Sequence, residues 1–446
     1  MAERLFGTDG VRGRAGEFPL DHETVARLGA ALVRSMGGGS ELRFVVGRDT
    51  REWGEWIERE LARGVRSQRA QLTSAGVIPT PAIAYVTRAM GFDAGFVISA
   101  SHNPFHDNGI KIFSGRGEKF TETLEREIEN IIADASWQVN GSADIPVEHT
   151  NVVDAYIAHA LLSFPEPHRL APFRMAVDTA NGATTTVAPR LFRDLGYDLR
   201  LLNAQPDGRN INLSCGSTHP EALSRAVVEL GCRMGVAFDG DGDRAIFADA
   251  AGRIVDGDAV LLMCARHMKA QGRLKGNAVV ATVMSNIGLE IALRASGIEL
   301  VRCPVGDKYV MEEMVAKDLS LGGEQSGHVI FSDHLFTGDG MATALQVLRL
   351  MAETGRELSD LAAEMVSYPQ VLVNVRVREK TDLQAVPAVA AVIHDIESKL
   401  RDEGRLLVRY SGTEPLLRIM IEGRDQQAIQ HWASQIAGTV KEHLGS

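Results

Sequence analysis

The chain has 446 residues, which is too long for a single hydrophobic core, so we expect two to four domains. Its formal net charge of −11 argues against a nucleic-acid partner, because binding to a phosphate backbone relies on clustered Lys and Arg. The four cysteines are scattered without a CxxC pair and predict neither a zinc site nor a disulfide framework. No apolar signal core opens the sequence and no apolar run approaches the ~20 residues of a membrane span, so we expect a cytoplasmic protein without a membrane partner.

Residues 1–150 are predicted to form a first α/β domain. Apolar residues recur at helical spacing over Val25, Leu28, Leu32 and Val33. Three apolar runs are typical of strands: 43–46, 70–76 and 94–99. Segment 133–150 loses periodicity and gathers polar and turn residues, so the first boundary is expected there.

The same alternation of strands and helices predicts a second α/β domain over 151–254 and a third over 255–368. The expected strands are 174–178, 198–202 and 233–239 in the second domain, and 277–283, 298–306 and 321–333 in the third. The strand-to-turn strings VVGRDTR, AVDTANGA and ATVMSNIG are alike, which indicates a triplicated unit, with chance similarity of such turns as the alternative.

From 369 to 446 the pattern changes to alternating strands with helices between them, which predicts a smaller α+β domain. Its expected strands are 371–377, 405–412 and 416–423. The predicted fold class is therefore α/β, with three similar mixed α/β domains and a smaller α+β C-terminal domain.

The string FDGDGDRAIF (238–247) alternates Asp239, Asp241 and Asp243 with glycine directly after an apolar strand. Such closely spaced negative charges repel one another unless a cation neutralises them, and glycine lets the backbone curl round an ion. A solvated acidic turn is the alternative. An EF-hand is excluded, because its loop needs glycine and glutamate where this chain has Arg244 and Ala250. We expect a magnesium ion here, with coordination positions left open for water or for phosphate oxygens. Arg244, directly after the last aspartate, is placed to meet the same anion.

The string VISASHNPFHDNGIKIF (97–113) runs from an apolar strand into a turn of small residues that carries Ser101 and His102. A helix-capping serine is one reading of this turn. In the other, Ser101 is a nucleophile or phosphate carrier, which needs a base and cationic help, and His102 and Lys111 are the nearby candidates. The chain has no GxSxG elbow and no P-loop, which sets serine hydrolases and Walker-type proteins aside.

Three further loops hold polar residues among glycines. GGEQSGH (322–328) carries Glu324, Ser326 and His328 after a strand, an arrangement suited to gripping sugar hydroxyls. RYSGTEPLLR (409–418) resembles an anion nest or, alternatively, a capped turn, and its donors are Arg409, Ser411, Gly412, Thr413 and Arg418. FGTDGVRG (6–13) places Arg12 near the start of the chain, where a flexible terminus is the alternative.

These five segments, in this order, resemble the α-D-phosphohexomutase superfamily over essentially the whole chain. Six strings narrow the resemblance to the branch that acts on glucosamine phosphates: FGTDGVRG, SASHNPFHDNGIK (99–111), PDGRNIN (206–212), CGSTHPE (215–221), GGEQSGH and TGDG (337–340). The resemblance implies four domains around a central cleft, each contributing one loop. Two strings depart from the family pattern, Trp53 in DTREWGEW and the Phe105–His106 pair, and both bear on local packing.

The resemblance also implies the role of each loop. Ser101 would carry a phosphoryl group, and Asp239, Asp241 and Asp243 would bind Mg2+ together with an oxygen on Ser101. The other residues complete two sets: Arg12, His102, Lys111 and Arg244 for catalysis, and Glu324, Ser326, His328, Arg409, Ser411, Gly412, Thr413 and Arg418 for substrate. Which of them is the general base stays open.

The implied reaction interconverts glucosamine 6-phosphate and glucosamine 1-phosphate and feeds UDP-N-acetylglucosamine synthesis. It would pass through phosphorylated Ser101, with glucosamine 1,6-bisphosphate as intermediate or activator. The alternatives are a phosphoglucomutase or phosphomannomutase on the same scaffold, a catalytically silent sugar-phosphate-binding regulator, and a phosphatase. The expected partner is a small phosphosugar, and the expected assembly is a monomer or a homodimer.

Overall fold

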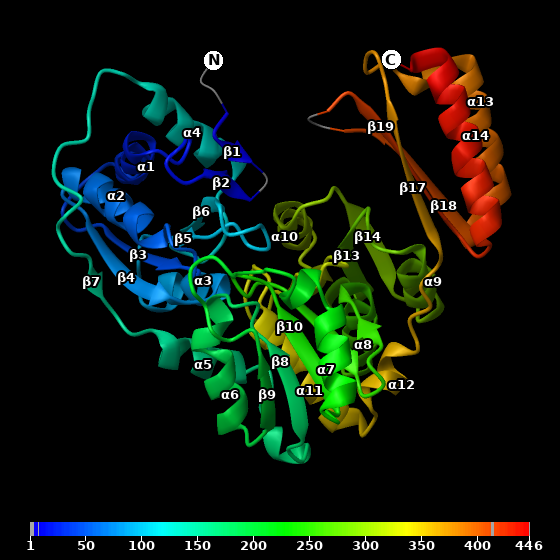
Figure 1. The fold of residues 1–446 in the computed structure, drawn as a ribbon, viewed down its shortest axis with the longest axis horizontal. Helices are drawn as coiled ribbons and strands as arrows, with labels where there is room; N and C mark the ends of the chain where they lie inside the picture. The colour runs from blue at the N-terminus through cyan, green and yellow to red at the C-terminus, as the bar shows by residue number, and fades with distance from the viewer. Residues whose placement is uncertain (1–3, 8, 412–413, 446) are drawn as a thin grey trace. The chain divides into compact units, whose positions relative to one another are not determined.

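The computed structural model describes residues 4–7, 9–411 and 414–445, and the chain folds into two compact units. The larger unit comprises residues 1–284 and 297–364, and the smaller unit comprises 285–296 and 365–446 (Figure 1). Within the described ranges, no helix combines the length and the apolar character that a membrane crossing requires.

The first sheet of the larger unit has seven strands in the order β1-β2-β6-β5-β3-β4-β7. They are Phe6–Gly7 (β1), Gly10–Arg14 (β2), Arg43–Arg48 (β3), Gln71–Val77 (β4), Ala94–Ile98 (β5), Asp107–Ser114 (β6) and Glu148–His149 (β7). The helices are His22–Ser35 (α1), Gly54–Ser67 (α2), Thr80–Ala89 (α3) and Glu122–Ala133 (α4). Helices α1 and α2 pack so closely that a Cβ at Gly64 would lie 1.9 Å from the carbonyl oxygen of Ala26.

The second and third sheets have the orders β12-β11-β10-β8-β9 and β14-β13-β15-β16. The strands of the second are Arg174–Asp178 (β8), Asp198–Leu202 (β9), Met234–Phe238 (β10), Ala245–Asp249 (β11) and Ile254–Val255 (β12). Those of the third are Ala278–Thr282 (β13), Glu299–Cys303 (β14), Leu321–Gly323 (β15) and Val329–Phe331 (β16). The accompanying helices are Val153–Leu161 (α5), Ala188–Asp194 (α6), Glu221–Glu229 (α7), Gly257–Ala270 (α8), Asp307–Ala316 (α10), Gly340–Thr354 (α11) and Leu358–Ala362 (α12).

One topology repeats in all three sheets. The inner orders β6-β5-β3-β4, β11-β10-β8-β9 and β16-β15-β13-β14 each place three parallel strands beside one antiparallel strand. The prediction of three similar mixed α/β domains is therefore confirmed. In each sheet, the loop that leads into the antiparallel strand carries one of the predicted site residues. The repeat therefore puts the loops with Ser101, Asp239 and Glu324 at equivalent positions.

The smaller unit is built on an antiparallel sheet of three strands in the order β17-β19-β18. The strands are Gln370–Arg376 (β17), Gly404–Tyr410 (β18) and Leu416–Gly423 (β19), and the helices are Ile287–Ala295 (α9), Pro387–Leu400 (α13) and Gln426–Leu444 (α14). Helices α13 and α14 lie side by side along this sheet (Figure 1), with Ile396, Ile436 and Ile419 buried between the layers. The predicted α+β C-terminal domain is confirmed.

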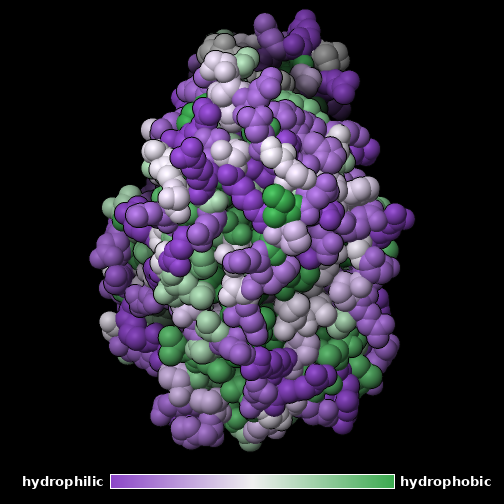
Figure 2. Space-filling view, turned by 90° about the vertical axis from the view of Figure 1, so that its left-hand side faces the viewer, coloured by the Kyte–Doolittle hydropathy of each residue, from purple (hydrophilic) through white to green (hydrophobic). Residues whose placement is uncertain are grey.

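The remaining regular segments among the described residues are short 3-10 helices: Pro167–Arg169, Ala183–Thr186, Gly216–Thr218, Lys275–Asn277, Leu383–Ala385 and Arg401–Glu403. On the face drawn in Figure 2, hydrophilic residues predominate and apolar residues are interspersed among them.

Candidate active site

Ser101 lies in the turn after β5, where its backbone has a left-handed conformation with φ of 50°. Its N–H donates to Oγ of Ser99 at 2.8 Å. Its carbonyl oxygen accepts from Arg51 at 2.9 Å and from Asn212 at 2.8 Å. Arg51 is itself fixed by a buried ion pair of 2.8 Å with Asp49. A non-glycine residue with positive φ persists only where its surroundings hold it, and these bonds hold the Ser101 turn.

The acidic loop follows β10, and Asp239, Asp241 and Asp243 are all buried. The hydroxyl of Ser101 donates to Oδ2 of Asp239 at 2.6 Å. The two turns approach closely at Gly240, where a Cβ would lie 2.5 Å from the carbonyl oxygen of Ser101. The structure therefore brings the serine loop and the acidic loop into direct contact, and glycine at 240 makes that contact possible.

Lys111, on β6, neutralises part of the acidic loop. Its Nζ lies 2.9 Å from Oδ2 of Asp241, 3.1 Å from Oδ2 of Asp243 and 3.1 Å from Oδ2 of Asp9. Although burial opposes a charge here, these three carboxylates raise the pKa of Lys111 well above its usual value. These contacts favour the ammonium form of Lys111, which supplies positive charge to the acidic loop.

The remaining charges separate the site into ionised and neutral groups. Burial and the other two carboxylates of the loop raise the pKa of Asp239 well above its usual range. Burial also opposes the charge of Asp241, but the adjacent ammonium lowers its pKa. Burial, and to a smaller extent Arg244, lowers the pKa of His102 to about 4, so its ring is neutral near pH 7. Nδ1 of His102 lies 3.5 Å from Oγ of Ser101.

The acidic loop fits a hard divalent cation. One oxygen from each of its three carboxylates lies within 4.8 Å of the other two. Oδ1 of Asp241 and Oδ1 of Asp243 are buried and find no hydrogen-bond partner within the described part of the chain, whereas the Oδ2 atoms of the same residues face Lys111. Buried acceptors without donors are costly, and a cation with oxygen ligands would satisfy both of them.

Two cavities open beside these loops. The first, the Asp243 cavity, has a volume of about 370 Å³, and its lining includes Arg12, Asp243 and His328. The second, the Gln325 cavity, has a volume of about 520 Å³, and its lining includes Gln325 and Ser326. His102, Arg244 and Glu324 line both cavities. The cavities are therefore adjacent, and together they extend from the acidic loop to the loop after β15.

Glu324 and His328 are fixed by main-chain donors. Oε1 of Glu324 accepts from the N–H of Gly306 at 3.2 Å, and its Oε2 accepts from the hydroxyl of Ser326 at 3.4 Å. Nε2 of His328 accepts from the N–H of Gly338 at 3.2 Å. Nε2 of His328 also lies 3.3 Å from Oδ2 of Asp307. The TGDG string and Asp307 thus both contact the buried ring of His328 beside the Asp243 cavity.

Comparison with known proteins agrees with this arrangement. Residues 3–139, 154–252 and 256–368 match the alpha/beta/alpha domains I, II and III of phosphoglucomutase/phosphomannomutase, and residues 372–439 match its C-terminal domain. The phosphoglucosamine mutase of Solibacter usitatus is 48% identical over 100% of both chains, and that of Geotalea daltonii is 46% identical over 99% of both. The chain belongs to the phosphoglucosamine mutase family. The predicted enzyme class, an isomerase of the phosphohexomutase type, is confirmed by this membership.

Solved structures share the fold over the whole length. A phosphoglucomutase/phosphomannomutase family protein from Burkholderia thailandensis superposes with a TM-score of 0.81 at 25% identity, covering 99% of this chain and 98% of that one. An N-acetylphosphoglucosamine mutase from Aspergillus fumigatus, in complex with GlcNAc-6P and magnesium, superposes with a TM-score of 0.68 at 18% identity, covering 98% of this chain and 95% of that one. The second likeness concerns the fold alone.

The C-terminal loop of this phosphoglucosamine mutase family member lies in the smaller unit. Arg409 and Arg418 are directly paired across β18 and β19. The N–H of Ser411 donates to the carbonyl of Leu416 at 2.8 Å, and its Oγ accepts from the N–H of Glu414 at 3.3 Å. Nε of Arg418 is buried and has no hydrogen-bond partner among the residues that the structure describes. The two other predicted residues, Gly412 and Thr413, lie outside the described residues.

The sequence had pointed to Arg12 but not to the acidic residue that orients it. Asp9 accepts from Arg12 through its carbonyl at 3.1 Å and through its carboxylate. Oδ1 of Asp9 also accepts from Lys119 at 2.6 Å, and Lys119 in turn pairs with Asp307 at the start of α10. Asp9 stands in the same glycine-rich string as Arg12, which was the available signal. Lys119 and Asp307 had no such signal, because only the fold brings them together.

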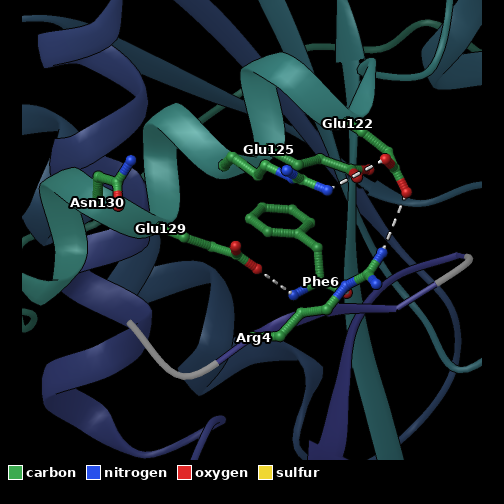
Figure 3. A pocket seen from close by; sticks show the side chains of 7 residues that line it. Arg4, Phe6, Glu122, Glu125, Glu129 and Asn130 are labelled. Carbon is green, nitrogen blue, oxygen red and sulfur yellow. Dashed lines mark hydrogen bonds and ion pairs between the residues drawn. The ribbon is translucent and has the colours of Figure 1, made fainter. Parts of the chain in front are cut away.

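The strand that precedes Asp9 is anchored by α4. The N–H groups of Leu5 and Phe6 donate to Oε1 of Glu129 at 2.8 and 2.9 Å. Figure 3 shows Glu129 reaching from the helix to the main chain beside Phe6, with Arg4 turned toward Glu122. This contact fixes where the first glycine-rich string enters the sheet, which the sequence did not indicate.

Proposed function

We propose that this chain interconverts glucosamine 6-phosphate and glucosamine 1-phosphate, with Ser101 as the carrier of the phosphoryl group. The observation that carries the proposal is the hydrogen bond of 2.6 Å between the Ser101 hydroxyl and Asp239, which joins a candidate nucleophile to a metal-binding set. The membership in the phosphoglucosamine mutase family supports the choice of an amino sugar phosphate as substrate.

In the first half of the reaction, a sugar hydroxyl attacks the phosphorus of phosphorylated Ser101. The bond from phosphorus to the sugar oxygen forms, the bond to Oγ of Ser101 breaks, and the proton of the sugar hydroxyl is taken up while Oγ gains one. The products are a bisphosphorylated sugar and unmodified Ser101. In the second half, the bisphosphate turns round and Oγ accepts its other phosphoryl group by the same exchange, so no phosphate is consumed.

The side chains around Ser101 suit this exchange. Lys111 and Arg244 are both cationic, because nearby carboxylates raise the pKa of each despite burial, and they balance charge on a transferring phosphoryl group. Arg12 lines the same cavity with its guanidinium oriented by Asp9. Neutral His102, with Nδ1 at 3.5 Å from Oγ, can hold or return a proton.

Mg2+ would be held by Asp239, Asp241 and Asp243, and it would neutralise charge at the reacting oxygens. Glu324, Ser326 and His328 are assigned to the sugar. The phosphate that does not react is assigned to Arg409, Ser411, Gly412, Thr413 and Arg418, on the chemistry of their donors. Positioning and electrostatics then account for most of the rate, since little covalent chemistry is left to the protein.

The test is a coupled assay for glucosamine 1-phosphate, together with mass spectrometry of the purified protein before and after phosphatase treatment. We expect turnover that needs Mg2+ and a single phosphate, of which Ser101 is the site. Faster turnover of glucose or mannose phosphates than of the amino sugar would contradict the assigned substrate. Stoichiometric release of inorganic phosphate would indicate a phosphatase, and an unmodified Ser101 in an active enzyme would remove the carrier role.

A further inference from the structure

The side-chain amide of Gln325 has a fixed orientation. Its Nε2 donates to Oδ2 of Asp256 at 3.0 Å, and a carboxylate can only accept. Oδ1 of Asp256 is already used, because it accepts from the N–H of Ala259 at 3.1 Å as the N-cap of α8. Asp256 therefore holds the amide nitrogen of Gln325 through one of its N–H groups, and Oε1, the acceptor of that amide, is not used by Asp256.

The main chain holds the Gln325 loop against α8 as firmly as the side chains do. The N–H of Gly257 donates to the carbonyl of Gln325 at 3.0 Å. A Cβ at Gly257 would lie 2.0 Å from the carbonyl oxygen of Glu324, so only glycine allows this approach. The Gln325 loop and the start of α8 are thus held in close contact, and this contact fixes the position of the Gln325 amide in the wall of the cavity.

Asp256, Gln325 and Glu324 all line the Gln325 cavity. Its charged and titratable lining groups are Asp256, Glu324, Arg244 and His102, of which Glu324, Arg244 and His102 also line the Asp243 cavity. Asp256 and Gln325 line the Gln325 cavity but not the Asp243 cavity, so the part that the two cavities do not share contains a carboxylate and an amide. Asp256 uses one of the two N–H groups of the amide.

We propose that Asp256 orients the amide of Gln325 so that its oxygen serves as the contact for the sugar, and that this contact selects a sugar with an ammonium group at C2 over the same sugar with a hydroxyl. An ammonium donates three hydrogen bonds and accepts none, so it suits oxygens beside two carboxylates. A hydroxyl both donates and accepts and carries no charge, so it gains less there. The inference rests on the proposed function, and it names Gln325 as a specificity-determining residue and Asp256 as its positioning residue.

The Asp256→Asn substitution tests the orientation directly. Asparagine caps a helix about as well as aspartate, so its oxygen keeps the bond to Ala259 and its amide nitrogen replaces Oδ2 opposite Gln325. Gln325 must then turn its oxygen toward that nitrogen and present N–H groups to the cavity. We expect the ratio of Kd for glucose 6-phosphate to Kd for glucosamine 6-phosphate, from calorimetry, to fall ~10-fold.

The double variant Asp256→Asn with Gln325→Glu is the matched control. Its asparagine nitrogen donates to one oxygen of the new glutamate, which leaves the other oxygen as an acceptor in the cavity. Preference for the amino sugar should therefore be high in the wild type, low in Asp256→Asn and high again in the double variant. Equal melting temperatures of the three proteins would show that the cap of α8 is kept.

A loss of affinity for both sugar phosphates alike in Asp256→Asn, or no recovery in the double variant, would overturn the inference and leave Asp256 a structural cap. So would a wild type that binds the two sugars equally. These binding results do not depend on turnover. A wild type that binds the amino sugar selectively but never isomerises it would contradict the proposed function instead.

Discussion

The hydroxyl of Ser101 lies 2.6 Å from Oδ2 of Asp239, although 138 positions separate the two residues in the chain. The first belongs to the loop after β5 and the second to the loop after β10, and these loops occupy the same position in two copies of one topology. The contact joins a hydroxyl in a strained turn to an acidic set that fits a divalent cation. The proposed phosphoryl transfer depends on this contact between Ser101 and Asp239.

Removal of the Ser101 hydroxyl should abolish turnover while leaving the fold intact. We expect Ser101→Ala to lower kcat by ~1000-fold or more, because no other group would carry the phosphoryl group between half-reactions. Steady-state kinetics with glucosamine 6-phosphate measure the loss. Ser163→Ala removes a buried hydroxyl that has no hydrogen-bond partner in the described ranges, and it should leave kcat unchanged. A wild-type kcat in Ser101→Ala would rule out the carrier role.

Thr80 should determine how tightly the acidic loop binds metal. Its hydroxyl donates to Oδ2 of Asp241 at 2.5 Å, and its N–H donates to the carbonyl of Asp241 at 2.8 Å. Thr80→Val keeps the shape but loses the hydroxyl, and we expect a ~10-fold weaker Kd for Mn2+, measured by electron paramagnetic resonance. Thr80→Ser retains the donor and serves as the control. Equal Kd values in all three proteins would mean that Thr80 only packs.

Glu125 and Lys308 should each depend on the other for their contribution to the stability of the fold. Nζ of Lys308 lies 2.8 Å from Oε2 of Glu125, and both side chains are at most 10% exposed. Glu125→Leu leaves a buried ammonium without its partner and should lower the free energy of unfolding by about 3 kcal/mol. Urea denaturation measures the change. The double variant with Lys308→Met should regain most of it, and a loss as large in the double variant would point to packing instead.

His159 should make the protein less stable in mild acid. The residue is 7% exposed, and its ring stacks between those of Tyr85 and His334, with ring centroids 3.9 Å apart in each pair. Burial, and then the neighbouring His334, lowers the pKa of His159 from 6.5 to about 4. Between these two values the unfolded chain binds a proton that the folded chain refuses, so stability falls as the pH drops from 6.5 toward 4 and the penalty is complete below 4.

The variant His159→Phe keeps the stack but cannot titrate. It should lose less stability than the wild type between pH 7.5 and pH 5, by on the order of 1 kcal/mol. Thermal unfolding at the two pH values measures the difference. Parallel losses in wild type and variant would assign the acid sensitivity to other groups.

Local patterns in the sequence already determined most of the fold and several of the site residues. The strands predicted at 174–178, 198–202 and 416–423 coincide with β8, β9 and β19. Short alternating or continuous apolar runs between turn residues are typical of strands. The antiparallel strands β6 and β11 escaped prediction. Each follows its loop so directly, the serine loop before β6 and the acidic loop before β11, that loop and strand form one continuous motif in the sequence.

The spacing of Asp239, Asp241 and Asp243 indicated a metal site from sequence alone, because closely spaced carboxylates repel unless something binds them. Sequence could not show that Lys111 neutralises them, that Thr80 orients Asp241, or that Asp256 turns the amide of Gln325. These contacts join residues distant in the chain. A hydrogen bond depends on distance and direction in space, and only the packing of sheets and helices sets those.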